Sequence, residues 1–210
     1  MMHIAIDGPA ASGKTSLGRA IAQYFHFLFV ETGKMYRAVA LGLDRGLSLD
    51  EVHVTMSDNS RILLNGEDVS DILHTPRLDQ GSSRVATRLE VRRLLVKLQQ
   101  EIAKGHDVVM EGRDIGTVVL PHANLKIFLQ ASPEERARRR ASERHQTQLD
   151  RTLREIITRD TRDQTRTIAP LNPASDATIM HTDNKSLAEV VSEAIALVEE
   201  RLHTGDTVAK

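Results

Sequence analysis

The chain has 210 residues, of which 40% are hydrophobic and 27% charged, with a formal net charge of −1 and no cysteine. This composition is typical of a globular domain and excludes wholesale disorder, disulfides and thiolate metal sites. The sequence contains neither an apolar run of transmembrane length nor a signal peptide, so we expect a cytoplasmic protein with no membrane partner. The near-neutral charge and an aromatic content of 3% argue against a nucleic-acid partner.

The first expected element is a short apolar strand at residues 3–6, which leads into the sequence GPAASGKT at residues 8–15. Leu17, Ile21 and Phe25 follow at helical spacing. A strand, a loop of pattern G-x-x-x-x-G-K-[ST] and a helix are the setting of a phosphate-binding loop, in which backbone N–H groups and the helix dipole attract the anion. The alternative is a glycine-rich turn before an ordinary helix, and the complete match makes it the weaker interpretation.

This loop predicts a site for a nucleoside triphosphate. In such a loop Lys14 reaches the β- and γ-phosphates, and the Thr15 hydroxyl is a ligand of Mg²⁺. We therefore expect ATP and Mg²⁺ to bind here. The expected ATP-binding residues of the loop are Gly8, Pro9, Ala10, Ala11, Ser12, Gly13, Lys14, Thr15 and Ser16.

A second strand is expected at residues 27–30, and Thr32 is placed to cap a helix that extends to about Gly46. Tyr36 and Arg37 lie near the start of this helix, where an aromatic ring and a guanidinium can hold a nucleoside monophosphate. Without further context, a partly buried tyrosine beside a surface arginine is the simpler interpretation.

A small antiparallel insertion interrupts the alternation of strands and helices at about residues 47–83. Ser48 and Glu51 form a capping-box pattern for a short helix. Strands are expected at residues 53–56 and 61–64, and Asn65-Gly66 predicts a hairpin turn that leads into residues 67–69. An insertion beside a phosphate loop is a candidate lid or specificity module.

A long helix is expected after the insertion. It begins at Thr75-Pro76, since proline is favoured at the first helical position. Its apolar stripe includes Val91 and Leu94 and extends to Ile102, and Gly105 ends it.

A buried strand at residues 108–110 leads directly into the sequence EGRDIGT. Ligands of open parallel sheets bind beyond the carboxyl ends of the strands. Glu111, Arg113 and Asp114 are therefore candidates to meet Mg²⁺ and a reacting phosphate. A salt-bridged loop is the alternative.

Arginine is concentrated in one region of the chain. Of the 28 basic residues 21 are arginine, and ten of these lie between Arg136 and Arg166. The planar guanidinium group of arginine carries a fork of N–H donors that suits phosphate oxygens, so this region is expected to bind small polyanions.

A strand at residues 125–129 precedes a helix that Ser132 caps, with Pro133 at its first position and Glu135 closing a capping box. We expect a phosphate-gripping lid at about residues 132–160. The arginines of its first helix are Arg136, Arg138, Arg139, Arg140 and Arg144.

In the next helix Arg159, Asp163 and Arg166 follow a spacing that places them on one helical face. One carboxylate cannot neutralise this many guanidinium groups, so an external anion is favoured over a simple ladder of salt bridges. A last strand at residues 177–180 and a capped helix at 186–202 follow, and we expect residues 203–210 to be a frayed tail.

Three stretches together resemble the bacterial-type cytidylate kinases. They are IAIDGPAASGKTS at residues 4–16, ETGKMYRAVAL at 31–41 and EGRDIGTVVLPHANLKIFLQASPEERARRR at 111–140. RDTRDQTRTIAPLNPASDA at 159–177 strengthens the resemblance, which covers nearly the whole chain. It implies a three-layer α/β P-loop kinase fold with a central parallel sheet, in a single domain at 1–210 that carries a small nucleotide-binding insertion and an arginine-rich lid.

Cytidylate kinases transfer the γ-phosphate of ATP to CMP or dCMP, and the resemblance implies the same in-line transfer here. It assigns catalysis to Lys14, Arg113, Arg159 and Arg166. It implies that Arg136 and Arg140 of the lid also bind ATP. The adenine of ATP is expected to pack against the loop after Ile168. The residues that the resemblance places around CMP are Thr32, Tyr36, Arg37, Arg113, Arg159 and Arg166 at the phosphate and sugar, Asp163 at the ribose, and Ser83, Arg92 and Asp114 at the cytosine.

The sequence departs from the family pattern at three places, one of which is Lys34, at a position that is more often small. Ala11 stands where many members have glycine, so the loop must adopt a conformation that alanine tolerates. The insertion is expected to hold only a hairpin of strand, where the best-known members have a three-stranded module.

Other functions stay open at this point. The nearest is another small-molecule P-loop kinase that phosphorylates UMP, AMP or a metabolite such as shikimate. A nucleotide-dependent switch or a nucleic-acid-binding ATPase is the alternative from a different class, although no N-K-x-D guanine signature is present. We expect a monomer.

Overall fold

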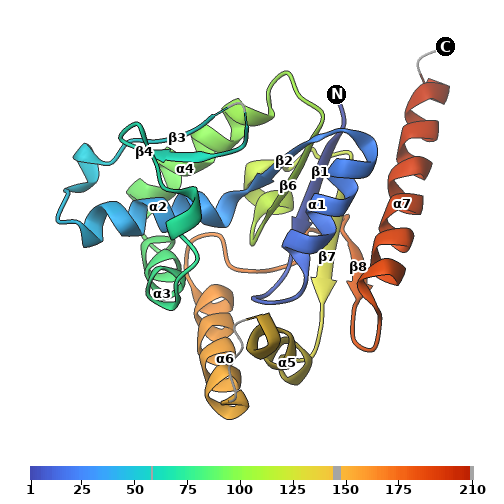
Figure 1. The fold of residues 1–210 in the computed structure, drawn as a ribbon. Helices are drawn as coiled ribbons and strands as arrows, with labels where there is room; N and C mark the ends of the chain where they lie inside the picture. The colour runs from blue at the N-terminus through green and yellow to red at the C-terminus, as the bar shows by residue number, and fades with distance from the viewer. Residues whose placement is uncertain (58, 144–147, 209–210) are drawn as a thin grey trace.

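The computed structural model describes residues 1–57, 59–143 and 148–208. Five parallel strands form a central sheet in the order β2, β6, β1, β7 and β8 (Figure 1). These strands are β1 (His3–Asp7), β2 (Leu28–Glu31), β6 (Val108–Gly112), β7 (Leu125–Gln130) and β8 (Thr178–His181). Ile4 and Ile6 of the central strand are completely buried, as expected where both faces of a parallel sheet are covered.

Helices cover the two faces of the sheet and complete a three-layer α/β arrangement (Figure 1). On one face lie α1 (Lys14–Phe25) and α7 (Leu187–Val208), and on the other lie α2 (Thr32–Asp44) and α4 (Leu89–Ala103). Leu17 of α1 and Val198 of α7 share one buried cluster. Met35 of α2 and Leu95 of α4 share the second.

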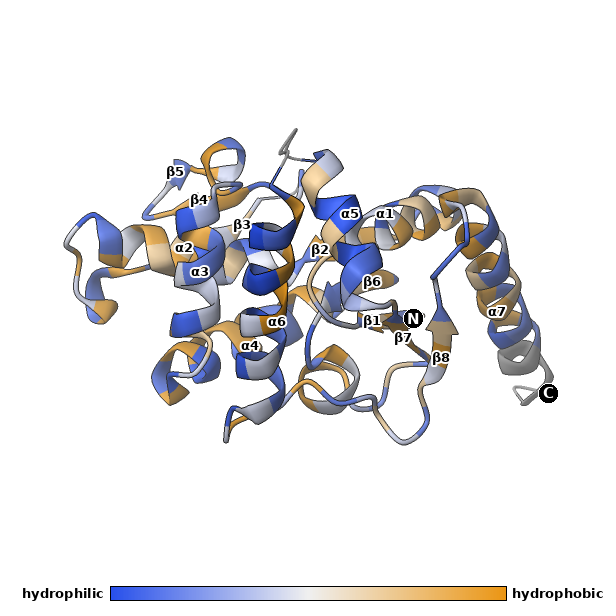
Figure 2. Ribbon diagram, turned by 90° about the horizontal axis from the view of Figure 1, so that it is seen from below, coloured by the Kyte–Doolittle hydropathy of each residue, from blue (hydrophilic) through white to orange (hydrophobic). Residues whose placement is uncertain are grey.

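Three further helices gather beyond the carboxyl ends of the strands. They are α3 (Pro76–Val85), α5 (Pro133–Glu143) and α6 (Leu149–Thr165). α5 packs against α6, and α6 contacts α3. Most of α5 is hydrophilic, in contrast to the apolar strands of the central sheet (Figure 2). The polar helices thus border the edge of the sheet where ligands of parallel α/β folds bind.

The insertion contains a separate antiparallel sheet of β3 (Val54–Met56), β4 (Ile62–Leu64) and β5 (Glu67–Asp68). Single turns flank it at η1 (Leu49–Glu51) and η2 (Ser70–Ile72), and the predicted capping box of Ser48 and Glu51 is confirmed. The expectation of only a hairpin of strand is wrong. The third strand has two exposed acidic residues and therefore carries no apolar alternation that would predict it.

Other local predictions also need correction. The long helix expected from Thr75-Pro76 to Gly105 is two helices, because Arg88 adopts an extended conformation between α3 and α4. Leu94 of the predicted apolar stripe is 44% exposed. The predicted frayed tail is also wrong in part, since α7 continues to Val208.

Two predicted helix caps differ in the structure. Thr32 is the first residue of α2 rather than its cap, and its hydroxyl donates to the carbonyl of Glu111, 2.8 Å away. At α5, the Ser132 hydroxyl accepts from the amide of Glu135 at 3.3 Å. The reciprocal half of that capping box is missing, because the Ser132 amide donates to Asp183 instead.

Within the described part of the chain, none of the helices combines the length and the apolarity needed to span a bilayer.

Candidate active site

The phosphate-binding loop connects β1 to α1, at the carboxyl end of the central strand. Gly8 and Gly13 have φ angles of 150° and 94°, and Ala11 adopts a left-handed φ of 58°. A Cβ on Gly8 would lie 2.5 Å from the carbonyl oxygen of Leu129, so only glycine fits there. No side chain caps α1, which leaves its first N–H groups available to an anion.

Lys14 lies folded over this loop. Its Nζ donates to the Pro9 carbonyl at 2.7 Å and to the Ser12 hydroxyl at 3.2 Å. Burial and, after it, the positive charge of Arg113 lower the pKa of Lys14 to about 7. The ammonium group therefore lacks a full counter-charge, and a phosphate would supply one.

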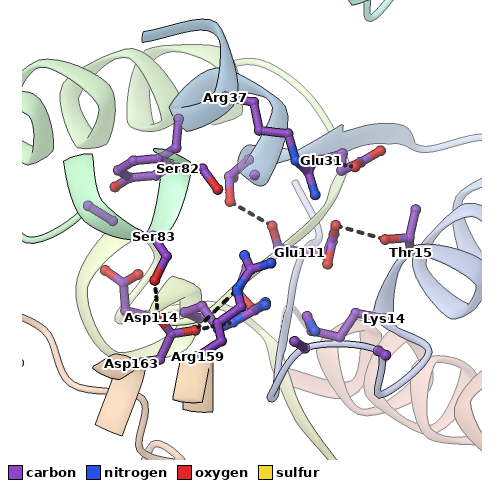
Figure 3. A pocket seen from close by; sticks show the side chains of 18 of the residues that line it. Lys14, Thr15, Glu31, Arg37, Ser82, Ser83, Glu111, Asp114, Arg159 and Asp163 are labelled. Carbon is purple, nitrogen blue, oxygen red and sulfur yellow. Dashed lines mark hydrogen bonds and ion pairs between the residues drawn. The ribbon is translucent and has the colours of Figure 1, made fainter. Parts of the chain in front are cut away.

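The side-chain oxygens of Thr15 and Glu111 lie together at the start of α1. The Thr15 hydroxyl donates to Glu111 Oε1, 3.0 Å away (Figure 3). Burial raises the pKa of Glu111. Among the described residues no cluster of three or more His, Cys, Asp or Glu side chains forms a metal cage. One hydroxyl and one carboxylate still fit Mg²⁺, which usually keeps waters and substrate phosphates as its other ligands.

Asp7 joins the loop strand to the EGRDIG segment. Its two carboxylate oxygens accept from the amides of Ile115 at 2.8 Å and Gly116 at 2.7 Å, at the start of the π-type turn η3 (Ile115–Val119). Burial raises the pKa of Asp7 to about 6. This connection fixes Arg113 and Asp114 relative to the phosphate-binding loop.

A cavity of about 110 Å³ lies between the loop, α2, α3 and α6, and we call it the arginine cavity (Figure 3). Among its described lining residues seven are cationic and four anionic, so it is electropositive. Its lining residues are Ala10, Ala11, Lys14, Thr15, Glu31, Thr32, Gly33, Tyr36, Arg37, Ser82, Ser83, Ala86, Arg92, Glu111, Gly112, Arg113, Asp114, Arg140, Arg159, Asp163 and Arg166.

Asp114 organises one end of the arginine cavity. Its carboxylate pairs with Arg92 and lies 3.4 Å from Nη2 of Arg166. The Arg92 guanidinium lies 6.0 Å from the centre of the Tyr36 ring, and burial raises the pKa of that tyrosine to about 12. Nη1 of Arg92 is buried without a hydrogen-bond partner in the described structure, so it is a donor available to a ligand.

Asp163 organises the centre of the cavity. It accepts from Nε of Arg113 at 3.1 Å and from the Ser83 hydroxyl at 3.4 Å, and Nε of Arg159 is 3.9 Å away. Burial opposes ionisation of Asp163, but the neighbouring guanidinium groups outweigh it and lower the pKa. Figure 3 shows Lys14 and Thr15 across the cavity from Ser83 and Asp163, with Arg159 between them.

A second, larger cavity of about 470 Å³ lies on the other side of the phosphate-binding loop, and we call it the loop cavity. Its lining residues are Ala11, Ser12, Gly13, Ser16, Leu129, Glu135, Arg138, Arg139, Ser142, Glu143, Thr182, Lys185, Leu187 and Val190. No described residue between Ile168 and Ala177 lines it, and the adenine contact expected of the loop after Ile168 stays a prediction.

The structure brings together all the residues predicted to surround CMP. Each of the ten lines the arginine cavity. The predicted ATP-binding residues are divided: most of the loop lines one cavity or both, whereas Gly8 and Pro9 line neither. Arg140 lines the arginine cavity. Arg144 lies outside the described residues.

The predicted role of Arg136 at ATP stays a prediction. This residue lines neither cavity, and its buried guanidinium donates to the carbonyls of Ala10 and Ala131 and pairs with Asp160. These contacts attach α5 to the phosphate-binding loop and to α6.

Several acidic partners of the arginines were missed from the sequence. Glu31 lies 3.3 Å from Nη1 of Arg37, and Asp79 contacts both Arg37 and Arg140. Glu31 ends β2 and lies within one of the family stretches, whereas Asp79 lies on α3 and in none of them. The only available signal is the surplus of arginine itself, which requires buried counter-charges somewhere in the fold.

The comparisons with known proteins agree with this geometry. The sequence model of the cytidylate kinase family matches residues 4–200. The chain belongs to the cytidylate kinase family. It is 43% identical to the cytidylate kinase of Thermotoga maritima, with 96% of this chain and 99% of the relative covered. It is 39% identical to that of Carboxydothermus hydrogenoformans, with 94% and 97% covered.

Solved structures support the P-loop kinase fold. A gluconokinase from Sinorhizobium meliloti aligns with a TM-score of 0.52 at 18% identity, covering 97% of each chain. A shikimate kinase from Bacteroides thetaiotaomicron aligns with a TM-score of 0.51 at 17% identity, covering 94% of this chain and 98% of the other. At these identities the likeness concerns the fold.

Proposed function

We propose that this member of the cytidylate kinase family phosphorylates CMP and dCMP with ATP as the donor. The observation that carries the proposal is the arginine cavity, in which ten residues from separate motifs converge beside Lys14. The cavity is electropositive and adjoins the phosphate-binding loop, as a site for phosphoryl transfer between two nucleotides requires.

The acceptor phosphate binds among Arg37, Arg113, Arg159 and Arg166. These guanidinium groups reach the cavity from α2, from the loop after β6 and from α6 with its C-terminal cap, and carboxylates of the protein hold them, so they are oriented before the substrate arrives. Thr32 and Tyr36 complete the wall on the α2 side, and Asp163 accepts a ribose hydroxyl.

The cytosine binds at the end organised by Asp114. The unpartnered Nη1 of Arg92 donates to the ring acceptors of the base. The Asp114 carboxylate and the Ser83 hydroxyl accept from its exocyclic amino group, which uracil replaces with an oxygen. An unpaired oxygen facing a buried carboxylate is unfavourable, so this arrangement favours cytosine over uracil.

The donor binds across the phosphate-binding loop. The loop cavity has the volume of an ordinary small-molecule site and accepts the nucleoside part of ATP. The loop amides and Lys14 hold the phosphates, and Thr15 with Glu111 would hold Mg²⁺. The ion, when bound, neutralises charge on the phosphates and orients them.

The protein contributes position and charge to the reaction. Lys14 faces the donor phosphates and the four arginines face the acceptor, whose phosphate oxygen is already ionised and needs no general base. Residues 47–83 and 132–160 enclose the site and exclude water, which would otherwise compete as acceptor. A monomeric, cytoplasmic enzyme without a nucleic-acid partner stays our prediction.

A panel of acceptors tests the proposal. The purified protein is incubated with ATP, Mg²⁺ and either CMP, dCMP, UMP, AMP or shikimate, and ADP release is measured. We expect turnover with CMP and dCMP to exceed turnover with the other acceptors. Turnover with shikimate or AMP in preference to CMP would refute the proposed acceptor while leaving the fold unchanged.

A further inference from the structure

The carboxylate of Asp79 connects arginines from three helices. Asp79 lies on α3 and is 7% exposed. Its Oδ1 lies 3.0 Å from Nε and 2.9 Å from Nη2 of Arg37, which belongs to α2. Its Oδ2 pairs with Arg140 of α5, and Nη1 of Arg159 on α6 is 3.9 Å from Oδ1.

Asp79 contacts these arginines from outside the arginine cavity. Arg37, Arg140 and Arg159 all line that cavity, whereas Asp79 lines a separate cavity of about 200 Å³ between α3, α5 and α6. An arginine has five N–H donors, and within the described part of the chain the contacts of Arg37 to Asp79 and Glu31 engage three of them. The remaining donors are available to a ligand, in an orientation that the two carboxylates fix.

We propose that Asp79 is a positioning residue for phosphoryl transfer, whose carboxylate orients Arg37 and Arg159 toward the acceptor phosphate and fixes Arg140 of the lid to the same point. This inference rests on the proposed function. It assigns one buried carboxylate to both the acceptor site and the lid, so displacement of either is transmitted to the other. The acceptor phosphate and Asp79 also compete for the same guanidinium groups.

The substitution Asp79→Asn tests this role because it keeps the shape and removes the charge. We expect kcat with CMP to fall by about tenfold or more, since the arginines lose their orientation. We expect the Kd for CMP, measured by calorimetry without ATP, to decrease by about threefold or more, since a competing anion is gone. A merely structural role would lower the active fraction and leave this Kd unchanged, and that result would refute the proposal.

Asp71→Asn is the matched control. This exposed carboxylate also pairs with an arginine, Arg61 at 2.6 Å, but lies on the insertion away from both cavities. Its kcat and its Kd for CMP should stay within about twofold of the parent protein. A control that changes as much as Asp79→Asn would overturn the assignment.

A double-mutant cycle tests the connection to the lid. If Asp79 acts through Arg140, then Arg140→Gln should reduce kcat in the parent protein and have less than about a twofold effect in Asp79→Asn. If Arg140→Gln lowered kcat by the same factor in the parent protein and in Asp79→Asn, the connection would be refuted.

Should Asp79→Asn fail to fold, Asp79→Glu provides the test, because it keeps the charge and displaces it by one methylene. We expect it to fold, to bind CMP as the parent does and to have a reduced kcat, whereas a parental kcat would overturn the proposal. A parent protein inactive toward CMP would instead refute the proposed function, so the two failures are distinguishable.

Discussion

Arg136 of α5 donates a hydrogen bond to the carbonyl of Ala10, 3.1 Å away, and thereby attaches the arginine-rich helix to the phosphate-binding loop. Asp160 of α6 pairs with the same guanidinium and accepts from the Ala10 amide at 3.4 Å. Three segments that are distant in sequence thus meet at one buried ion pair. This contact fixes the base of the proposed lid.

Removal of the Arg136 guanidinium should destabilise the protein. In Arg136→Met the Asp160 carboxylate is left buried and unpaired, so the free energy of unfolding should fall by about 3–5 kcal/mol. Urea denaturation measures the change, and Arg136→Met with Asp160→Asn should recover part of it. As a control, Arg151→Met removes an exposed arginine that pairs with Glu155 and should change the free energy by less than about 0.5 kcal/mol.

An Arg136→Met protein of normal stability but weakened ATP binding would contradict this assignment. It would support the role at ATP that the family resemblance implies. Measuring both stability and ATP binding of this variant therefore distinguishes a structural role of Arg136 from a role in binding ATP.

ATP affinity should depend on the charge of Lys14. Burial lowers the pKa of this side chain to about 7, and bound phosphates favour its charged form. Above pH 7 ATP binding must therefore take up a proton, and the Kd should rise with pH by a factor that approaches about ten per unit. Calorimetric titrations between pH 7 and 9 measure this slope.

Lys14→Arg is the control for this titration. A guanidinium stays charged throughout the range, so the pH dependence should disappear in this variant. A slope that persists would assign the proton to another group.

The lowered pKa of Lys14 also affects stability. Between pH 7 and 10.5, the ordinary pKa of a lysine, the unfolded state holds a proton on Lys14 that the folded state has lost. The contribution of Lys14 to stability therefore rises with pH in that window.

Asp114 should determine the preference for the base. Asp114→Asn replaces an acceptor with a side chain that can also donate to the oxygen of uracil. We expect kcat/KM for CMP to fall by about 30-fold or more, because Arg92 and Arg166 lose a buried counter-charge. The ratio of UMP to CMP activity should rise.

The control for base preference is Asp163→Asn, which removes a carboxylate at the centre of the same cavity. We expect it to reduce kcat/KM for CMP and UMP by similar factors. A ratio that changes equally in both variants would show that Asp114 does not read the base. Steady-state kinetics with both acceptors gives the comparison.

Ala11→Gly should stabilise the protein. Ala11 has a left-handed φ of 58°, which costs a residue with a Cβ roughly 1–2 kcal/mol. The greater freedom of glycine in the unfolded chain offsets about half of this, so we expect a net gain of about 0.5–1 kcal/mol. Ala10→Gly is the control, because Ala10 has no positive φ and should lose stability. Urea denaturation of both variants measures the difference, and a loss of stability in Ala11→Gly would contradict the prediction.

Much of the fold could be predicted because its signals are local. The phosphate-binding loop, the buried strands and the capping box of Ser48 and Glu51 each depend on residues a few positions apart, and the structure has them. The break between α3 and α4 was missed since the apolar spacing continues across it. The segment of β5 was expected to follow the Asn65-Gly66 turn, but its two acidic residues have no apolar alternation that would identify them as a third strand.

The site was predictable to the extent that its residues lie in motifs. Most arginines of the site, together with Asp114 and Asp163, belong to the family stretches, whereas Arg92 and Asp79 do not. Asp79 meets Arg37 at a separation of 42 residues and Arg140 at 61, so only the folded chain brings them together. Counter-charges of this kind have no periodicity that a sequence pattern can reveal.

Ala11 lines both the arginine cavity and the loop cavity, which makes the phosphate-binding loop a wall shared by two compartments. A single inhibitor that occupies both compartments must therefore pass this residue. Its linker has to be slender where it meets the Ala11 methyl group and anionic where it meets the loop amides. The short polyphosphate bridges of bisubstrate analogues have this shape, so the loop defines the chemistry by which such a compound can be built.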